Sequence, residues 1–412
     1  MKNILLLLAA TLLVQPACSK LDHEGNLRAD EVAPVVPIEL TKGERTLRDA
    51  SNEFGLKTFR SLYAASNGGT VSFSPLSLSL ALAMAAEGAE GETWQQFREV
   101  LGWDAATKDE LGAYYEKMVA GLVKVDANVQ FTSANSFWAA KTFPLKTDYA
   151  SLLKRYFAAE SYTVDFGLPA TLKQINGWCS DKTDGKIPHM LDELDPRMSL
   201  MLINALLFKA PWKLTWEVLK DRDFTTAAGA KTRKEYLHTR EQDLLYGDYG
   251  DFELVRAPYG NGAYTMDIIL PKEGKTLAGI LPTLSSEDIN YNLRSSKVTL
   301  YLPKWSTEYS TEDLLIPAMK AQGLTLPFDP NAADFSGIST SPTYIDMIKQ
   351  KVKIDVTEKG TEFAAVTVIG IKVSSAMPVT PPRVTVDVNR PFAYTIREST
   401  SGTILLLGTL SD

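Results

Sequence analysis

Apolar residues recur at helical spacing near the start of this 412-residue chain, and they alternate with other residues further along it. The helical spacing predicts three helices, at 46–65, 75–87 and 92–101. Alternation and short apolar runs predict strands at 131–138, 205–208, 264–270, 298–302, 384–388 and 403–410. Helices that precede strands in this way indicate an α+β fold, and no repeat or linker divides the chain after residue 45.

The extreme N-terminus has the pattern of an export signal. Lys2 precedes an apolar run at 4–14, which is too short to span a bilayer and suits the hydrophobic region of a signal peptide. A helix buried in the core is the alternative. The run leads to Ala17 and Cys18, and this junction resembles the lipobox of bacterial lipoproteins. We therefore expect cleavage after residue 17 and a lipid on Cys18.

These features divide the chain into a signal peptide at 1–17, a flexible tether at 18–44 and a folded domain at 45–412. The tether mixes charged residues with prolines and lacks periodicity, as linkers do. We expect the mature protein to be anchored at a bacterial cell envelope, on the outer membrane, facing the periplasm or the surface. The lipid would be its one contact with the membrane.

Charge and composition argue against several functions. Lys and Arg total 43 and Asp and Glu total 50, so the net charge is −7, and no long basic run offers a nucleic-acid surface. The three histidines, His23, His189 and His238, leave little material for a metal site or an imidazole base. Cys179 has no intrachain partner if Cys18 is lipidated, so we interpret it as a buried apolar residue. No metal, nucleotide or organic cofactor is indicated.

Motifs of catalysis are missing as well. Gly274-Lys275-Thr276 resembles the end of a phosphate-binding loop, but Ile269 stands where that loop requires a glycine. The sequence contains no Gly-x-Ser-x-Gly elbow, no His-Glu-x-x-His and no Cys-x-x-Cys pair. We do not expect the chain to be an enzyme.

Five blocks of sequence, in order along the chain, resemble the serpin family. They are FSPLSL at 73–78 with ALAM at 81–84, QINGW at 174–178 with TDGKI at 183–187, LINA at 202–205 with FKAPW at 208–212, EKGTE at 358–362, and NRPF at 389–392 with TILLLG at 403–408. The resemblance covers residues 45–412. It implies the serpin fold, with three β-sheets, eight or nine helices and an exposed reactive-centre loop near the C-terminus.

The resemblance also implies a function. The loop would act as bait for serine proteases, with cysteine proteases as a second class of target. After the protease cuts the loop and forms an acyl-enzyme, the loop inserts into the main sheet as an additional strand and carries the enzyme with it. We expect a monomer. A non-inhibitory serpin, which binds or carries a ligand or is merely cleaved as a substrate, is the alternative.

The segment 358–373 alternates like a strand and leads into a proline-rich stretch. The resemblance assigns the hinge of the loop to seven of its residues: Glu358, Gly360, Thr361, Glu362, Phe363, Ala364 and Ala365. The thirteen residues from 361 to 373 would extend over roughly 43 Å as a strand. Small inward side chains favour fast insertion, but Phe363 stands where the family has a small residue, and its ring needs space.

The resemblance places the bait bond among four residues: Lys372, Val373, Ser374 and Ser375. Counting from the hinge gives the bond between Ser374 and Ser375, whereas counting back from the C-terminal block gives a position near Thr380. Lys372 suits a trypsin-like protease, and Val373 and Ser374 suit an elastase-like protease. A merely solubilising role for Lys372 is the alternative.

A second group of residues is expected to control the opening of the sheet: Ser74, Ser77, Asn204, Gln350 and Trp212. Gln350 occupies the position of a histidine that the family usually has near Ser74, Ser77 and Asn204. A glutamine both donates and accepts hydrogen bonds, but it cannot act as a proton switch. We therefore expect these residues to gate the sheet and not to catalyse a reaction.

Overall fold

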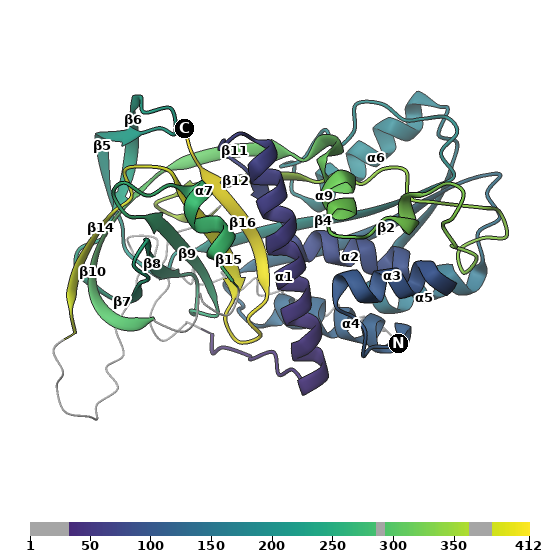
Figure 1. Cartoon of the computed structure of the whole chain (residues 1–412), viewed down its shortest axis with the longest axis horizontal. Coiled ribbons are helices and arrows are strands. Elements are labelled where there is room, and N and C mark those ends of the chain that lie inside the picture. Colours follow the sequence, from purple (N-terminus) through teal and green to yellow (C-terminus); the bar gives the residue numbers. More distant parts are fainter. Residues whose placement is uncertain (1–32, 286–292, 362–380) are drawn as a thin grey trace, which may run out of the picture.

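The computed structural model describes residues 33–285, 293–361 and 381–412. Eight α-helices lie in these ranges: α1 Lys42–Ala65, α2 Pro75–Ala86, α3 Gly91–Leu101, α4 Lys108–Lys124, α5 Thr147–Phe157, α6 Pro169–Lys182, α7 Leu277–Ile280 and α9 Leu315–Ala321. Three short 3₁₀ turns accompany them: η2 Leu281–Thr283, η3 Glu312–Leu314 and η4 Leu326–Phe328. Helices α2 to α6 gather on one side of α1, and strands β5 to β8 lie on the other side (Figure 1).

A six-stranded sheet runs in the order β11-β12-β13-β4-β2-β3. Its strands are β2 Gln130–Ala140, β3 Glu160–Val164, β4 Leu200–Pro211, β11 Trp305–Ser310, β12 Lys351–Thr357 and β13 Gly360–Thr361. The central strand β4 is antiparallel to both β2 and β13. The sheet therefore contains one member, β13, that is only two residues long and lies between two full-length strands.

The other strands form a ten-stranded sheet in the order β1-β16-β15-β9-β8-β7-β10-β6-β5, with β14 paired to β10. They are β1 Ser72–Phe73, β5 Glu217–Thr225, β6 Lys231–His238, β7 Gln242–Asp248, β8 Phe252–Pro258, β9 Tyr264–Pro271, β10 Arg294–Pro303, β14 Arg383–Asp387, β15 Phe392–Glu398 and β16 Ile404–Leu410. Strand β10 pairs with β7 up to Val298 and with β6 from Tyr301. The described strands thus form two continuous sheets, and the larger one changes partner along β10.

Local sequence explains where the first two helices begin. Thr41 and Glu44 form a capping box at the start of α1, in which each side chain satisfies the backbone N–H of the other. The Ser74 side chain accepts a hydrogen bond from the N–H of Ser77, and Pro75 takes the first helical position of α2. Nearly every residue of α2 is buried, so this helix lies within the larger apolar core.

Two apolar cores lie on opposite faces of the six-stranded sheet. The larger core joins α1 and α2 to both sheets and includes Phe59, Leu80 and Leu407. The smaller core lies under α6 and includes Trp178 of that helix and Met201 of β4. Because alternate side chains of β4 enter alternate cores, this strand has no exposed face.

One boundary from the sequence is wrong. The tether was predicted to continue to residue 44, but the chain joins the folded body before that. The backbone N–H of Val36 donates to the carbonyl of Val125, and the N–H of Ile38 donates to the Thr400 hydroxyl. Ile38 and Leu40 are buried, and α1 begins at Lys42. Two apolar side chains covered by the domain outweigh the polar composition of the surrounding sequence.

Each predicted helix and strand overlaps an observed one, and most of their ends agree to within two residues. Helices α4, α5, α6, α7 and α9 and several strands of both sheets were not predicted. No helix among the described residues is long and apolar enough to cross a membrane.

Candidate functional site

Strand β13 lies between β12 and β4 and hydrogen-bonds to both. Thr361 pairs with Val356 of β12 on one side and with Ala210 of β4 on the other. Gly360 has a φ of +142°, and a Cβ at this position would lie 2.1 Å from the carbonyl oxygen of Ala210. Only glycine therefore allows the chain to turn from β12 into the space beside β4.

Thr361 is held by a side chain from outside the sheet. Its hydroxyl lies 2.6 Å from the hydroxyl of Tyr259, and both residues are buried. The Tyr259 ring stacks on Trp212, with 4.2 Å between the ring centroids. Trp212 in turn donates from Nε1 to the carbonyl of Thr357, at 2.8 Å. Trp212 thus belongs to the hinge end of the site.

A salt bridge fixes the other side of the hinge. Lys304 Nζ lies 2.9 Å from a carboxylate oxygen of Glu358 and 2.9 Å from one of Glu235. The hydrogen bond from Lys304 holds the pKa of Glu358 below its usual value. The turn that precedes β13 is therefore tied to the end of β10 as well as to its own sheet.

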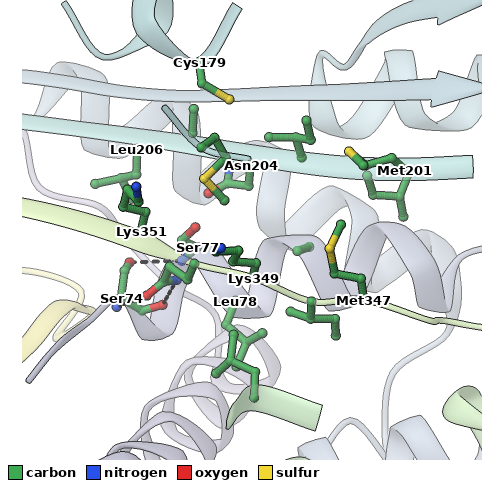
Figure 2. Close-up of a pocket in the computed structure, with 18 of the residues that line it drawn as sticks. Ser74, Ser77, Leu78, Cys179, Met201, Asn204, Leu206, Met347, Lys349 and Lys351 are labelled. Atoms are coloured by element: carbon green, nitrogen blue, oxygen red, sulfur yellow. Dashed lines mark hydrogen bonds between the residues drawn. The ribbon is translucent and has the colours of Figure 1, made fainter. Parts of the chain in front are cut away.

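Beyond Thr361, β4 and β12 are separated. Within the described residues no hydrogen bond pairs these two strands, and β13 alone links them. A cavity of about 500 Å³ lies along the separation, lined by β4, by α2 and by the chain from 342 through β12. Figure 2 shows this cavity with β4 along one wall and the segment that leads into β12 along the other. We call this cavity the slot.

Gln350 closes the floor of the slot against α2. Its Oε1 accepts from the N–H of Ser74 at 2.7 Å, and its Nε2 donates to the carbonyl of Ser74 at 3.0 Å. The backbone of Gln350 also bonds to Thr311. A glutamine can make both bonds to Ser74 at once because it carries a donor and an acceptor on one planar group.

The structure brings some of the predicted gating residues together and separates others. Ser74, Ser77, Asn204 and Gln350 all line the slot, whereas Trp212 does not. Asn204 donates to Asn135 and Ser133 on β2, and within the described residues it makes no hydrogen bond to Gln350. Its Oδ1 is buried and has no hydrogen-bond partner among the described residues.

Several predicted residues lie outside the described residues. These are the lipidation site Cys18, the hinge residues Glu362, Phe363, Ala364 and Ala365, and the bait residues Lys372, Val373, Ser374 and Ser375. Cys179 lines the slot with a free thiol, and burial raises the pKa of that thiol to about 12. The described residues contain no cluster of His, Cys, Asp or Glu that could hold a metal ion.

Sequence reasoning missed Tyr259 and Lys304. Tyr259 follows Pro258 at the end of β8, and Lys304 follows Pro303 at the end of β10. Each of them follows a proline at the end of a strand, and such a proline marks a turn. It does not identify the contact partner, which lies about one hundred residues further along the chain for Tyr259 and about fifty for Lys304.

Comparisons with known proteins agree with this architecture. The family model described as serpin (serine protease inhibitor) matches residues 49–412. An uncharacterized serpin-like protein of Thermococcus kodakarensis is 31% identical over 377 residues, which cover 90% of this chain and 86% of that protein. The leukocyte elastase inhibitor of Xenopus tropicalis is 30% identical over 382 residues, which cover 89% of this chain and 99% of that protein.

The native crystal structure of tengpin, a thermophilic serpin, superposes with a TM-score of 0.79 at 28% identity, over 92% of this chain and 97% of that one. The sheet with a slot beside a short hinge strand, and the match over most of the chain, define the class. The chain belongs to the serpin family, most of whose members are protease inhibitors.

Proposed function

We propose that this chain is an inhibitory serpin, which traps serine proteases by inserting its cleaved reactive-centre loop between β4 and β12. The position of β13 carries this proposal. Gly360 and Thr361 already occupy the first two places of an additional strand, with ladder hydrogen bonds on both sides. The slot continues along the path that the following residues would take.

The register of β13 predicts how far the loop would reach. Thr361 pairs with Ala210 in antiparallel fashion, so each later loop residue would face an earlier residue of β4. Ile371 would then face Leu200, the first residue of β4. Lys372 is the first loop residue beyond the end of that strand. A cut at Lys372 or just after it would therefore release a strand that matches β4 in length.

The same register identifies the neighbours of the inserted side chains. Phe363 would face Phe208, whose ring already contacts Tyr264 with 5.2 Å between centroids. Thr367 would face Asn204, whose Oδ1 lacks a partner in the described residues. A threonine hydroxyl placed there would donate to this oxygen, and aromatic pairs across strands are favourable. The slot thus offers specific partners to the two residues.

The choice of target follows from the bait residues. Cleavage after Lys372 would serve trypsin-like proteases, and cleavage after Val373 or Ser374 would serve elastase-like proteases. Cysteine proteases are a second class of target, because they too form an acyl-enzyme with the chain that they cut. The fold needs no catalytic residue of its own, because the target enzyme performs the chemistry.

We also propose that the protein is exported and anchored by a lipid on Cys18. The apolar run at 4–14 and the position of the cysteine directly after Ala17 support this. Residues 18–35 would then connect the membrane to the folded body, which begins with the contact of Val36 to Val125. Growth with a radiolabelled fatty acid tests the anchor: label is expected on the native chain and absent from a C18S variant.

The test of inhibition mixes the purified chain with trypsin and with elastase and resolves the products on a denaturing gel. A covalent band at the summed mass is expected, and mass spectrometry of the released C-terminal peptide identifies the cut bond. Cleavage without such a band for every protease would support the alternative, a non-inhibitory serpin.

A further inference from the structure

The walls of the slot are rich in sulfur. Met190, Met198, Met201 and Met347 line it together with Cys179, so four of the ten methionines of the chain border one cavity. Figure 2 shows Met201 on β4 and Met347 on the facing segment before β12, with Cys179 above β4. Met190 and Met198 come from the connection between α6 and β4, which lies over the same face.

These methionines lie where the sheet must change. Met201 belongs to the small core under α6, and Met190 and Met198 pack against that core. If a strand enters the slot, β4 and β12 move apart, and the contacts between β4 and the layer under α6 must rearrange. Methionine suits such a layer because its side chain is unbranched, flexible and polarizable, and it repacks at small cost.

The sulfur-containing residues that line the slot differ in exposure. Met347 is 37% exposed, in a stretch at 342–350 that forms neither helix nor strand, whereas Met201 is 7% exposed and Cys179 is 2% exposed. Burial raises the pKa of the Cys179 thiol to about 12, so little of the reactive thiolate is present at neutral pH. A thioether needs no deprotonation to react. Met190 and Met198 are half-buried, so Met347 is the most exposed of the sulfur-containing residues that line the slot and the one among them that a dissolved oxidant reaches most readily.

We propose that Met347 is an oxidation site at which peroxide shifts this protein from trapping proteases toward being cleaved by them. The peroxide transfers one oxygen atom to the thioether sulfur, which is oxidised by two electrons to the sulfoxide, and the peroxide is reduced to water. The regulation rests on the proposed function, but the chemistry at Met347 and its effect on the slot do not.

The sulfoxide acts through the wall of the slot. Oxidation converts an apolar thioether into a polar sulfoxide. An incoming strand must then displace water from the sulfoxide oxygen without replacing the hydrogen bonds that the water made. Insertion is slowed while hydrolysis of the acyl-enzyme is not, so a larger share of the chain is cleaved. We expect insertion to slow by about tenfold, which corresponds to the cost of burying one polar group without a partner.

The experiment uses the full chain in a M377L background, because Met377 stands in the loop itself and its oxidation would confuse the result. Hydrogen peroxide is limited to about one sulfoxide per chain, and peptide mass spectrometry locates it. The ratio of cleaved to trapped chain is then measured with trypsin before and after oxidation. We expect this ratio to rise by about tenfold in M377L and to change by less than about twofold in M347L/M377L.

M118L/M377L is the matched control, since Met118 is buried in α4 away from the slot, and it should respond as M377L does. A Met347 sulfoxide that leaves the ratio unchanged would overturn the proposal, as would equal sensitivity of M347L/M377L.

A second readout does not depend on trapping. A synthetic peptide of residues 361–373 is added to the intact chain, and its insertion is followed as a rise in the melting temperature. Slower insertion after oxidation in M377L but not in M347L/M377L supports the site even if no protease is trapped, a result that would count against the proposed function alone. Equal rates before and after oxidation would reject the site.

Discussion

Tyr259 and Thr361 meet through their hydroxyl groups, 2.6 Å apart and buried, at the place where β13 begins between β12 and β4. Tyr259 lies between β8 and β9 of the ten-stranded sheet, so this bond connects β13 of the six-stranded sheet to the other sheet. Gly360 and Thr361 are thereby fixed between β12 and β4, at the end of the slot.

Removal of the tyrosine hydroxyl tests this connection. Y259F leaves the Thr361 hydroxyl buried without its partner, and we expect the free energy of unfolding to fall by about 1–3 kcal/mol. Denaturant titration measures the change. Y309F is the matched control, because the Tyr309 hydroxyl makes no hydrogen bond among the described residues. An equal loss of stability in both variants would contradict the role given to the Tyr259 hydroxyl.

The salt bridge between Lys304 and Glu358 should contribute modestly. Both side chains are partly exposed, so solvent screens the pair, and we expect K304M and E358Q each to lower the free energy of unfolding by about 1 kcal/mol. If the pair is the cause, the double variant loses less than the sum of the two single losses. Additive losses in this double-mutant cycle would show that the two residues act independently.

Glu87 predicts a dependence of stability on pH. It lies at the C-terminal end of α2, and burial raises its pKa from the ordinary 4.5 to about 8, with Asp109 adding to the effect. Neither carboxylate oxygen has a hydrogen-bond partner among the described residues. The folded chain therefore holds a proton that the unfolded chain releases. Its contribution to stability is complete below the ordinary pKa and is lost as the pH rises through about 8.

We expect E87Q to remove this dependence. Between about pH 5 and pH 9 the native chain should lose about 2–4 kcal/mol of unfolding free energy relative to E87Q. Thermal melts across that range provide the measurement, with E116Q on the exposed face of α4 as the control. Parallel curves for the native chain and E87Q would mean that Glu87 does not titrate in this range.

Thr367 should matter only after the loop is cut. In the register of β13 it would face Asn204, so T367V is expected to destabilise the cleaved chain by about 1–3 kcal/mol and to leave the uncleaved chain unchanged. Denaturation of both forms measures the difference. V366T, one residue earlier and on the opposite face of the strand, is the control. A loss in the uncleaved form instead would place Thr367 elsewhere.

The sequence located elements of different burial: β9, which is buried along its whole length, was predicted, whereas α4, α5 and α6, which each bury one face, were not. Strand β4 was predicted over 205–208 alone, although it extends over Leu200–Pro211, because both of its faces are covered and alternation is lost. Ile38 and Leu40 were assigned to the tether because two apolar residues among polar ones produce no periodicity. Their burial depends on the distant Val125 and Thr400.

Some contacts of the candidate site were also predictable from the sequence, and others were not. The resemblance to serpins pointed to Gln350 and Ser74, which the structure joins by two hydrogen bonds. It grouped Trp212 with them, yet Trp212 lies at the hinge, on Tyr259. Tyr259 is separated from Thr361 by 102 residues, and no local sequence pattern predicts a contact between residues that far apart. The slot exists because β4 and β12 are separated, and neither strand contains a sequence pattern that predicts this separation.

The central claim is that the cut loop becomes a strand between β4 and β12. Amide hydrogen exchange in these two strands, before and after cleavage at the loop by a catalytic amount of trypsin, tests it most directly. We predict that slot-facing amides of β4 and β12, which β2 and β11 leave unpaired, become strongly protected in the cleaved chain. Exchange rates that remain the same in both strands after complete cleavage would contradict insertion.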